Sequence, residues 1–550
     1  MSKYYWLNNL SRDFLKKWYL VWEQTAEERI LEIWKHAEKV LGIVGFCDKF
    51  VNYMSLGYYS LSTPIWCNYW NDRWLEISCY GSNISDNIES ILYTQAEVGM
   101  MSKFWWWTSW YFGQLRPRWA KIKNNWESSG AVHFMQLFKS ITDVISQGSS
   151  RRWAFTPYLD IEHSDIKEFL KIWTEWNPIQ NMTTGVCVSS DWLKSMVEWD
   201  EDKREIWAEV LKTRSEIGYP YIFFKDNVND NKPQWYENKT IYHTNLCSEI
   251  ALPNNENESF VCCLSSINLL HWDEIVKTDA IEILFMFLDG VMSEFIRKLE
   301  NFKWDKKYFM QRALNFAKRH RAIWLGVLGW HSYLQKNMIP FASDEAMELT
   351  KTIFSKIKER TGSATRELAS IYWEAEVCKW YGVRNATTMA IAPTTSSAFI
   401  LGQVSQSIEP YMSNYFVKDT AKAKVTFQNP YLKDLLVSKS MDTQDVWNNI
   451  KSNDWSVQYI DWLTDKEKEV FKTFAEIDQA KIIDQASIRQ KYIDQWQSLN
   501  ILLPWDASVK EINRLHLLAW ESGIKWLYYQ HSFNKAQEVK RKISCVWCEA

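Results

Sequence analysis

The chain has 550 residues, 46% of them hydrophobic, which is enough for one large α/β domain or for several ordinary ones. The 64 basic and 67 acidic residues nearly cancel, and this balance argues against a nucleic-acid or membrane-surface protein. The sequence contains no run of about 18 apolar residues, the length that could span a bilayer, and the N-terminus lacks the apolar core of a signal peptide. The ten cysteines are therefore expected to be reduced thiols.

Helical periodicity dominates the first 60 residues, where Ser11 is a candidate cap for one helix and residues 27–40 are predicted to form another. From about residue 76, short apolar runs alternate with longer helical segments. The expected strands lie at 77–80, 131–135, 155–159, 221–224, 260–264 and 389–393, and the expected helices at 280–299, 307–335 and 343–381. This alternation predicts an α/β barrel or sheet rather than separate small domains.

The expected organisation is a helical region at 1–75, an α/β unit with helical insertions at 76–533 and an exposed tail at 534–550. The tail ends in Cys545-Val546-Trp547-Cys548, a pair that can be oxidised and reduced while visiting another site. Half of a zinc site is the alternative, although no second C-x-x-C occurs. The sequence has no P-loop, HExxH, EF-hand or GxGxxG motif, so bound phosphates would need another device.

A cysteine lies between an amide and a carboxylate in Asn245-Leu246-Cys247-Ser248-Glu249. In an extended segment, residues two apart share a face, so the three polar side chains would meet one substrate. The alternative is a buried cysteine in a strand, since free cysteine is commonly a core residue.

Further elements accompany this one in a fixed order along the chain. They are Leu61-Ser62-Thr63-Pro64-Ile65, Ile77-Ser78-Cys79-Tyr80-Gly81, the segments 146–152, 260–269, 328–332 and 388–397, Ser407-Ile408-Glu409-Pro410, Leu527-Tyr528-Tyr529-Gln530 and the terminal cysteine pair. The ordered set resembles the large catalytic subunit of class I ribonucleotide reductase from about residue 10 to residue 550, in a form without an N-terminal ATP-cone.

The resemblance implies a ten-stranded α/β barrel whose finger loop carries the radical cysteine, with an N-terminal helical segment and helical additions. Cys247 matches the cysteine whose thiyl radical abstracts the ribose 3′ hydrogen. Glu249 matches the general base for the 3′-hydroxyl, and Asn245 matches the amide that orients the ribose hydroxyls. Cys79 and Cys262 match the two thiols that supply the reducing electrons.

The remaining thiols and the paired tyrosines are interpreted in the same way. Cys263 would point away from Cys262 into the core, and the other cysteines outside the tail have no family counterpart. Tyr528 and Tyr529 match the tyrosines that relay the radical, although adjacent aromatics in a strand more often serve packing.

Substrate and effector sites also follow from the resemblance. Hydroxyls and backbone N–H groups would hold the substrate diphosphate, as a nest or a helix N-terminus does. The candidate substrate-binding residues are Ser62, Thr63, Ser78, Pro393, Thr394, Thr395, Ser396 and Ser397. The candidate effector-binding residues are Asp86, Arg116, Arg118, Gln147, Arg151 and Arg152.

The resemblance implies that this chain binds no metal or cofactor of its own. The radical would come from a metal-containing small (beta) subunit, a thioredoxin or glutaredoxin-type reductant would renew the thiols, and ATP and dNTPs would act as allosteric effectors. The chain is expected to be a cytoplasmic homodimer that reduces ribonucleoside diphosphates for DNA synthesis. A cobalamin-dependent class II reductase and an inactive regulatory relic of the fold are the alternatives.

Tryptophan is over-represented: the chain has 34 Trp and 17 Gly, whereas an average composition of about 7% glycine would give about 38. Tryptophan stands where the resembled family has glycine, most clearly at Trp105, Trp106, Trp107, Trp110, Trp119 and Trp153, and similarly at Trp324, Trp496 and Trp547. Glycine suits turns with positive φ and close backbone approach, which an indole does not allow cheaply. The hypothesis is that the gene uses UGA for glycine and was translated here with tryptophan; genuine tryptophan enrichment is the alternative.

Overall fold

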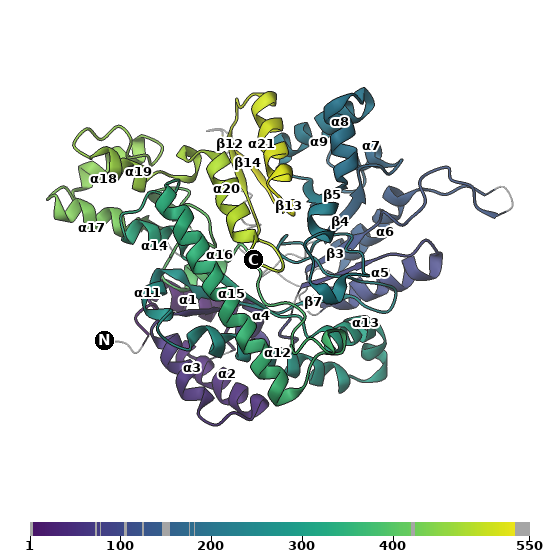
Figure 1. Cartoon of the computed structure of the whole chain (residues 1–550), viewed down its shortest axis with the longest axis horizontal. Coiled ribbons are helices and arrows are strands. Elements are labelled where there is room, and N and C mark those ends of the chain that lie inside the picture. The colour runs from purple at the N-terminus through teal and green to yellow at the C-terminus, as the bar shows by residue number, and fades with distance from the viewer. Residues whose placement is uncertain are drawn as a thin grey trace.

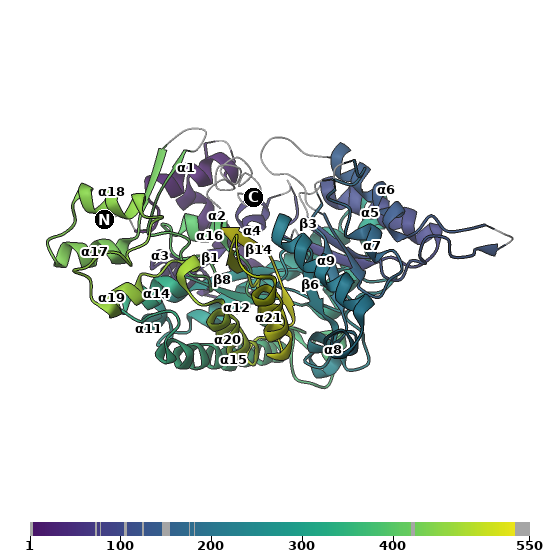
Figure 2. The same cartoon turned by 90° about the horizontal axis from the view of Figure 1, so that it is seen from above.

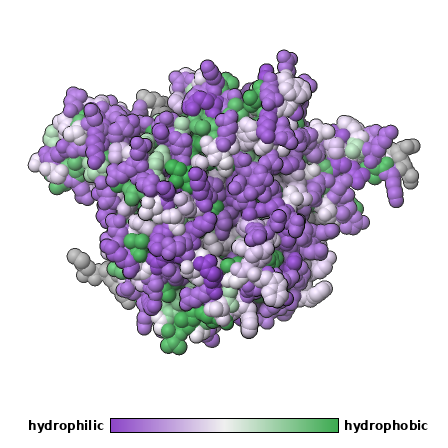
Figure 3. All heavy atoms as spheres, viewed as in Figure 1, coloured by the Kyte–Doolittle hydropathy of each residue, from purple (hydrophilic) through white to green (hydrophobic). Residues whose placement is uncertain are grey.

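The computed structural model describes residues 4–21, 23–71, 74–77, 79–103, 107–123, 126–145, 155–174, 176–180, 182–419 and 424–533. Strands lie in the middle of the molecule and helices surround them in two perpendicular views (Figures 1 and 2). Within the described ranges, no helix has the length and apolar character needed to cross a membrane. The face seen in Figure 3 is mostly hydrophilic.

Three helices form the N-terminal part of the chain: α1 (Asn9–Trp18), α2 (Ala26–Leu41) and α3 (Phe46–Ser55). The prediction of Ser11 as a cap was wrong, because the side chain of Asn8 accepts the N–H of Ser11 and therefore caps α1. Helix α2 starts at a reciprocal capping box between Thr25 and Glu28. The predicted helix at 27–40 is confirmed.

A seven-stranded sheet follows, in the order β13-β6-β5-β4-β3-β2-β7. Its strands are β2 (Cys79–Asn83), β3 (Trp107–Tyr111), β4 (Phe155–Asp160), β5 (Gly185–Val188), β6 (Tyr221–Phe224), β7 (Phe260–Cys262) and β13 (Trp526–Leu527). Strands β2 to β6 are parallel, and β7 and β13 pair antiparallel at the two edges. Because consecutive strands are parallel, each connection must cross back over the sheet.

Helices precede this sheet, cross between its parallel strands and follow β6. They are α4 (Thr63–Asn68), α5 (Ile88–Lys103), α6 (Ala131–Val144), α7 (Ile166–Phe169), α8 (Ser190–Glu198), α9 (Glu201–Ile217) and α10 (Lys225–Asn229). The prediction of a strand at 131–135 was wrong, because this apolar run is the first turn of α6. Its buried residues Val132, Met135 and Phe138 recur with helical spacing.

A second sheet has three strands: β1 (Tyr59–Leu61), β8 (Leu264–Asn268) and β9 (Trp324–Leu328). Strand β1 is antiparallel to β8, and β8 is parallel to β9. A helix predicted over 307–335 was wrong, because β9 interrupts it between α13 (Trp304–His320) and α14 (Trp330–Lys336). At Gly326 in β9, an added Cβ would lie 2.9 Å from the Ala390 carbonyl oxygen, so the packing there excludes a side chain.

The rest of the chain is mostly helical. The remaining elements are α11 (Trp272–Ile275), α12 (Ala280–Glu300), α15 (Asp344–Tyr372), α16 (Thr395–Ile400), β10 (Tyr415–Asp419), β11 (Lys424–Gln428), α17 (Pro430–Ser438), α18 (Gln444–Ser452), α19 (Asp465–Val470), α20 (Gln479–Gln490), β12 (Ile501–Pro504), α21 (Val509–Glu521) and β14 (Gln530–Phe533). The mixed α/β fold with helical additions is confirmed, whereas closure of a ten-stranded barrel and the domain limits stay predictions.

Several tryptophans adopt a backbone conformation that favours glycine. Of the fifteen non-glycine residues with positive φ among those described, six are tryptophan: Trp70, Trp119, Trp176, Trp373, Trp380 and Trp455. The left-handed region costs an ordinary residue about 1–2 kcal/mol. The turn argument fails for Trp107 and Trp110, however, because both lie in strand β3.

Candidate active site

Residues 245–250 form a tight loop that closes on itself. The Asn245 N–H donates to the Ile250 carbonyl at 2.8 Å. The Asn245 side-chain oxygen accepts the N–H groups of Glu249 at 3.0 Å and Ile250 at 3.1 Å, and Ser248 has a φ of 54°. The extended segment predicted here was therefore wrong: it is a turn, and its backbone hydrogen bonds hold Cys247 at the tip.

Residues far along the chain anchor this loop from outside. The Ser498 hydroxyl donates to the Cys247 carbonyl at 2.5 Å, and the Trp526 indole N–H donates to the Ser248 carbonyl at 2.5 Å. The backbone N–H of Trp496 donates to the Glu249 carbonyl at 3.0 Å. These three contacts fix the tip through its backbone carbonyl groups.

One hydrogen bond joins the loop to the large sheet. The side-chain amide of Asn245 donates to the Cys79 sulfur at 3.1 Å. Cys79 begins β2 and is the register partner of Cys262 in β7, and residues directly opposite in an antiparallel pair have Cα atoms about 4.5–5.5 Å apart, within the range that a disulfide spans. The structure thus brings Asn245 to Cys79 and the backbone of Cys262 beside it.

The other cysteines outside the tail lie away from this arrangement. Cys263 is buried, its thiol contacts the Leu288 carbonyl, and burial raises the pKa of the Cys263 thiol well above its usual value. Its predicted core position is confirmed. Cys67, Cys187 and Cys378 are buried and Cys47 is partly buried, as expected for structural thiols.

The paired tyrosines lie at the edge of the same sheet. The ring centroids of Tyr528 and Tyr529 are 4.4 Å apart. Tyr528 is buried, whereas Tyr529 is partly exposed. The buried ring of Tyr221 in β6 lies 4.8 Å from Tyr528 and 5.1 Å from Tyr529. Tyr529 is therefore the ring nearer the surface, and Tyr528 is the ring nearer the interior.

The predicted phosphate-binding hydroxyls converge from two segments. Ser62 precedes α4, and residues 393–397 lie at the start of α16, where every side chain is partly exposed. The Ser397 hydroxyl approaches the Leu61 carbonyl at 3.5 Å, which places the two segments side by side. The Thr394 hydroxyl accepts the Ser407 N–H at 2.8 Å, and the Thr63 hydroxyl contacts Tyr19 at 2.9 Å.

The effector candidates separate into two groups. Arg116 donates through Nε to the Asp86 carboxylate at 2.6 Å, so these two are brought together. Arg118 instead bonds Glu168, at 2.6 and 2.9 Å. Directly after both arginines, backbone hydrogen bonds from Trp119 to Ser128 and from Ile122 to Trp126 form a hairpin, and an arm projects from the body at this part of the chain in Figures 1 and 2. The predicted site residues Ser78, Gln147, Arg151, Arg152, Cys545 and Cys548 lie outside the described residues.

No group of three or more His, Cys, Asp or Glu side chains that could hold a metal occurs among the residues described. The family model of the ribonucleotide reductase barrel domain matches residues 77–204, 201–373 and 371–530. The chain belongs to the ribonucleotide reductase family. The resemblance read from the ordered motifs is thereby confirmed.

Three proteins similar to this chain, two viral and one bacterial, show how far the similarity extends. A Frog virus 3 protein described as a ribonucleoside-diphosphate reductase large subunit is 35% identical over 504 residues, covering 88% of this chain and 87% of its own. The large subunit of Invertebrate iridescent virus 3 is 29% identical and covers 91% and 92%. Among solved structures, the class Id ribonucleotide reductase alpha subunit of Actinobacillus ureae has a TM-score of 0.91 at 51% identity, covering 98% of this chain and 99% of that one.

Sequence reasoning missed Ser498 and Tyr221 in this reductase. Ser498 anchors the cysteine loop from 251 residues away, and no local pattern marks such a contact. Tyr221 lies in a run of aromatic and apolar residues that reads only as a buried strand. The sequence pattern does not indicate that the Tyr221 ring contacts Tyr528 and Tyr529.

A partly buried carboxyl near the tyrosine pair predicts a pH effect on the stability of the reductase. Glu409 accepts a hydrogen bond from Asn500 at 2.5 Å, and Asn500 accepts the Tyr529 N–H. Burial raises the pKa of Glu409 from 4.5 to about 7, so its neutral form stabilises the fold. That contribution is fully present below the unfolded pKa of 4.5 and is lost as pH rises through about 7.

Glu409→Gln should therefore become more stable, relative to the unchanged chain, as pH rises from about 4.5 to about 7. Thermal unfolding followed by circular dichroism at several pH values measures this difference. A difference that stays constant over the range would show that Glu409 is not the titrating group. The buried Asp289 behaves in the opposite way. Arg321 and Arg384 lower its pKa, so its contribution to stability is lost as pH falls rather than as pH rises.

Proposed function

We propose that this chain is the catalytic large subunit of a class I ribonucleotide reductase, and that it converts ribonucleoside diphosphates to 2′-deoxyribonucleotides. The observation that carries the proposal is the hydrogen bond from Asn245 to Cys79. It places the loop with Cys247 and Glu249 against the strand pair that carries Cys79 and Cys262. A radical thiol, a base and a dithiol are the groups that this reduction needs.

The proposed reaction begins with a radical on Cys247. The Cys247 thiyl radical takes the 3′ hydrogen of the ribose, and Glu249 accepts the proton of the 3′-hydroxyl. The 2′-hydroxyl leaves as water, and Cys79 and Cys262 supply two electrons and two protons as they become a disulfide. Cys247 then returns a hydrogen atom to the 3′ carbon and regains its radical, and Glu249 returns the proton to the 3′ oxygen, so that both groups are restored. Asn245 orients the ribose hydroxyls during these steps.

The remaining roles are proposals of the same kind. Hydroxyls and N–H groups of the segments at 62–63, 78 and 393–397 would bind the diphosphate. Asp86, Arg116 and Arg118, with residues 147, 151 and 152, would bind ATP or dNTP effectors. A small subunit would supply the radical through Tyr529 and Tyr528, and the enzyme would act as a cytoplasmic homodimer.

Neighbouring cysteines provide a matched test of the proposed function. Cys262→Ser should lower deoxynucleotide formation by about 10²-fold or more with every reductant, because the electron donor is lost. Cys263→Ser should retain turnover, because that thiol only contacts the Leu288 carbonyl in the core. Product formation from cytidine diphosphate in the presence of the small subunit measures both. Equal rates for the two variants would contradict the proposed dithiol.

The terminal cysteines are proposed to renew that dithiol. Cys545→Ser or Cys548→Ser should stop repeated turnover with a protein reductant, yet permit about one turnover from the prereduced Cys79 and Cys262 pair. A small dithiol that enters the site should restore steady turnover. Single-turnover and steady-state assays separate the two cases, and equal loss of activity with both reductants would remove the shuttle role.

A further inference from the structure

Tryptophan and glycine occupy equivalent places in the backbone of this chain. Helix α2 ends at Gly42, with a φ of 65° and an N–H that donates to the carbonyl four residues earlier. Helix α15 ends at Trp373, whose N–H likewise donates to the carbonyl four residues earlier, at Ala369, and whose φ of 71° and ψ of 162° fall in a region that is essentially restricted to glycine. Glycine is the usual residue at such a helix end, because it has no Cβ to oppose the left-handed conformation.

The side chains at these positions do not explain why an indole would be kept. Trp373 is 84% exposed, Trp380 is 87% exposed and Trp176 is 93% exposed. Trp70 and Trp119 are exposed as well, and all five have positive φ. An exposed indole gains little from burial. Trp70 contacts the His36 ring and Lys39, and Trp380 contacts Lys379, but no ring or cation–π contact is seen for the exposed indoles of Trp119, Trp176 and Trp373 among the described residues.

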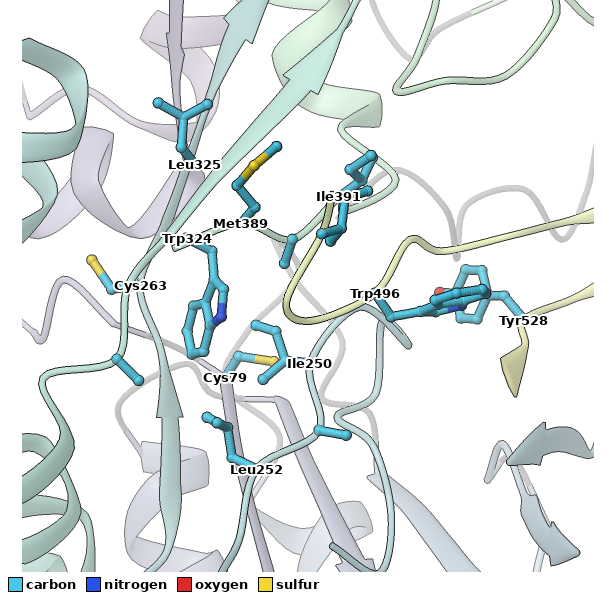
Figure 4. Close-up of a cluster of buried hydrophobic side chains, with 14 of the residues drawn as sticks. Cys79, Ile250, Leu252, Cys263, Trp324, Leu325, Met389, Ile391, Trp496 and Tyr528 are labelled. Atoms are coloured by element: carbon cyan, nitrogen blue, oxygen red, sulfur yellow. The ribbon is translucent and has the colours of Figure 1, made fainter. Parts of the chain in front are cut away.

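Two other tryptophans lie inside the candidate active site. Trp324 in β9 and Trp496 beside the cysteine loop are both completely buried. Figure 4 shows them in one cluster of buried side chains with Cys79, Ile250 and Tyr528. The Trp324 indole N–H has no hydrogen-bond partner, whereas a buried indole usually finds one.

The functional side chains have little exposed surface while both indoles are present: Cys79, Cys247 and Glu249 are only 7%, 9% and 2% exposed. The Trp324 indole lies near Cys79 and Ile250 in Figure 4. The backbone N–H of Trp496 donates to the Glu249 carbonyl, and its indole N–H donates to the Trp526 carbonyl at 3.0 Å beside Tyr528. Removing both buried indoles would leave empty space on two sides of the cysteine loop.

We infer that the working enzyme carries glycine at the six positive-φ tryptophan positions and at positions 324 and 496, and that the glycines at 324 and 496 open the cavity for the ribose of a nucleoside diphosphate. One codon translated as tryptophan instead of glycine accounts for both the strained surface turns and the filled site. The cavity part rests on the proposed function; the identity of the residues does not.

Peptide mass spectrometry of the protein isolated from its native cells tests the residue identities directly. Glycine is expected at 70, 119, 176, 324, 373, 380, 455 and 496. Trp330 is the internal control, because it lies inside helix α14 and its indole donates to Gln485 at 3.1 Å. Tryptophan at 324 and 496 in the native peptides would overturn the inference.

Binding of cytidine diphosphate tests the cavity. A variant with all eight tryptophan-to-glycine substitutions is expected to bind this probe in calorimetry. A variant with every substitution except Trp324→Gly, or every one except Trp496→Gly, should lose at least tenfold in affinity. The matched control omits only Trp373→Gly, which leaves an exposed indole at the end of α15, and it should bind as the eight-site variant does.

Circular dichroism of all four proteins establishes that each is folded, so that lost binding reports a filled site. Equal binding by the variants that keep Trp324 or Trp496 would overturn the cavity. Deoxynucleotide formation is measured separately. An eight-site variant that binds cytidine diphosphate but forms no product with the small subunit would support the cavity and count against the proposed function.

Discussion

In the protein that carries glycine at the eight positions given above, Cys247→Ser should abolish deoxynucleotide formation while leaving nucleotide binding intact. A serine hydroxyl does not form the hydrogen-abstracting radical under these conditions, so the rate should fall by about 10³-fold or more, as when the group that does the chemistry is removed. The substitution changes one atom, and the loop is held through backbone groups, including the Cys247 carbonyl that accepts from Ser498. The fold should therefore be unchanged.

Product formation with the small subunit and calorimetric binding of cytidine diphosphate measure the two properties. Cys187→Ser is the matched control, because it makes the same change at another buried thiol, which donates to the Tyr242 carbonyl. That variant should turn over normally. A normal rate for Cys247→Ser would show that another residue carries the radical, and lost binding would show that the thiol has a structural role.

The parts of the fold that were predicted correctly are those that local pattern determines. The strands at 155–159 and 221–224 and the helix at 280–299 are confirmed. The strand expected at 131–135 is instead the start of α6, since a five-residue apolar run fits either period. Strand β9 was hidden inside a helical pattern because its partner β8 lies about 60 residues earlier in the chain.

The candidate site shows the same division. The motif around Cys247 predicted candidate site residues, but their geometry depends on a turn in which the Asn245 side chain accepts the N–H groups of Glu249 and Ile250. The pairing of Cys79 with Cys262 is set by an antiparallel register across 183 residues of chain, which spacing alone does not encode. The tryptophan excess was visible in the composition, whereas the positive φ at Trp373 and Trp380 required the backbone.

The tyrosine pair is where the fold adds most to the sequence. Adjacent aromatic residues in a strand ordinarily serve packing, and burial of Tyr528 is consistent with that alternative. The 4.4 Å separation of the rings, with Tyr529 the more exposed of the two, is also the arrangement that a relay from a partner subunit would need. A substitution that removes only the phenolic O–H distinguishes packing from relay.

Tyr528→Phe should lower the rate of turnover by about 10³-fold or more, because phenylalanine fills the same space but has no phenolic O–H to oxidise. Tyr529→Phe should have the same effect. Tyr219→Phe is the control, since its ring lies 6.1 Å from Tyr529 at the side of the pair and should only contribute packing. Product formation with the small subunit measures activity, and thermal unfolding confirms the fold. Full activity in Tyr528→Phe would reduce the pair to a packing contact, and activity that needs adenosylcobalamin but no small subunit would identify the cobalamin-dependent class instead.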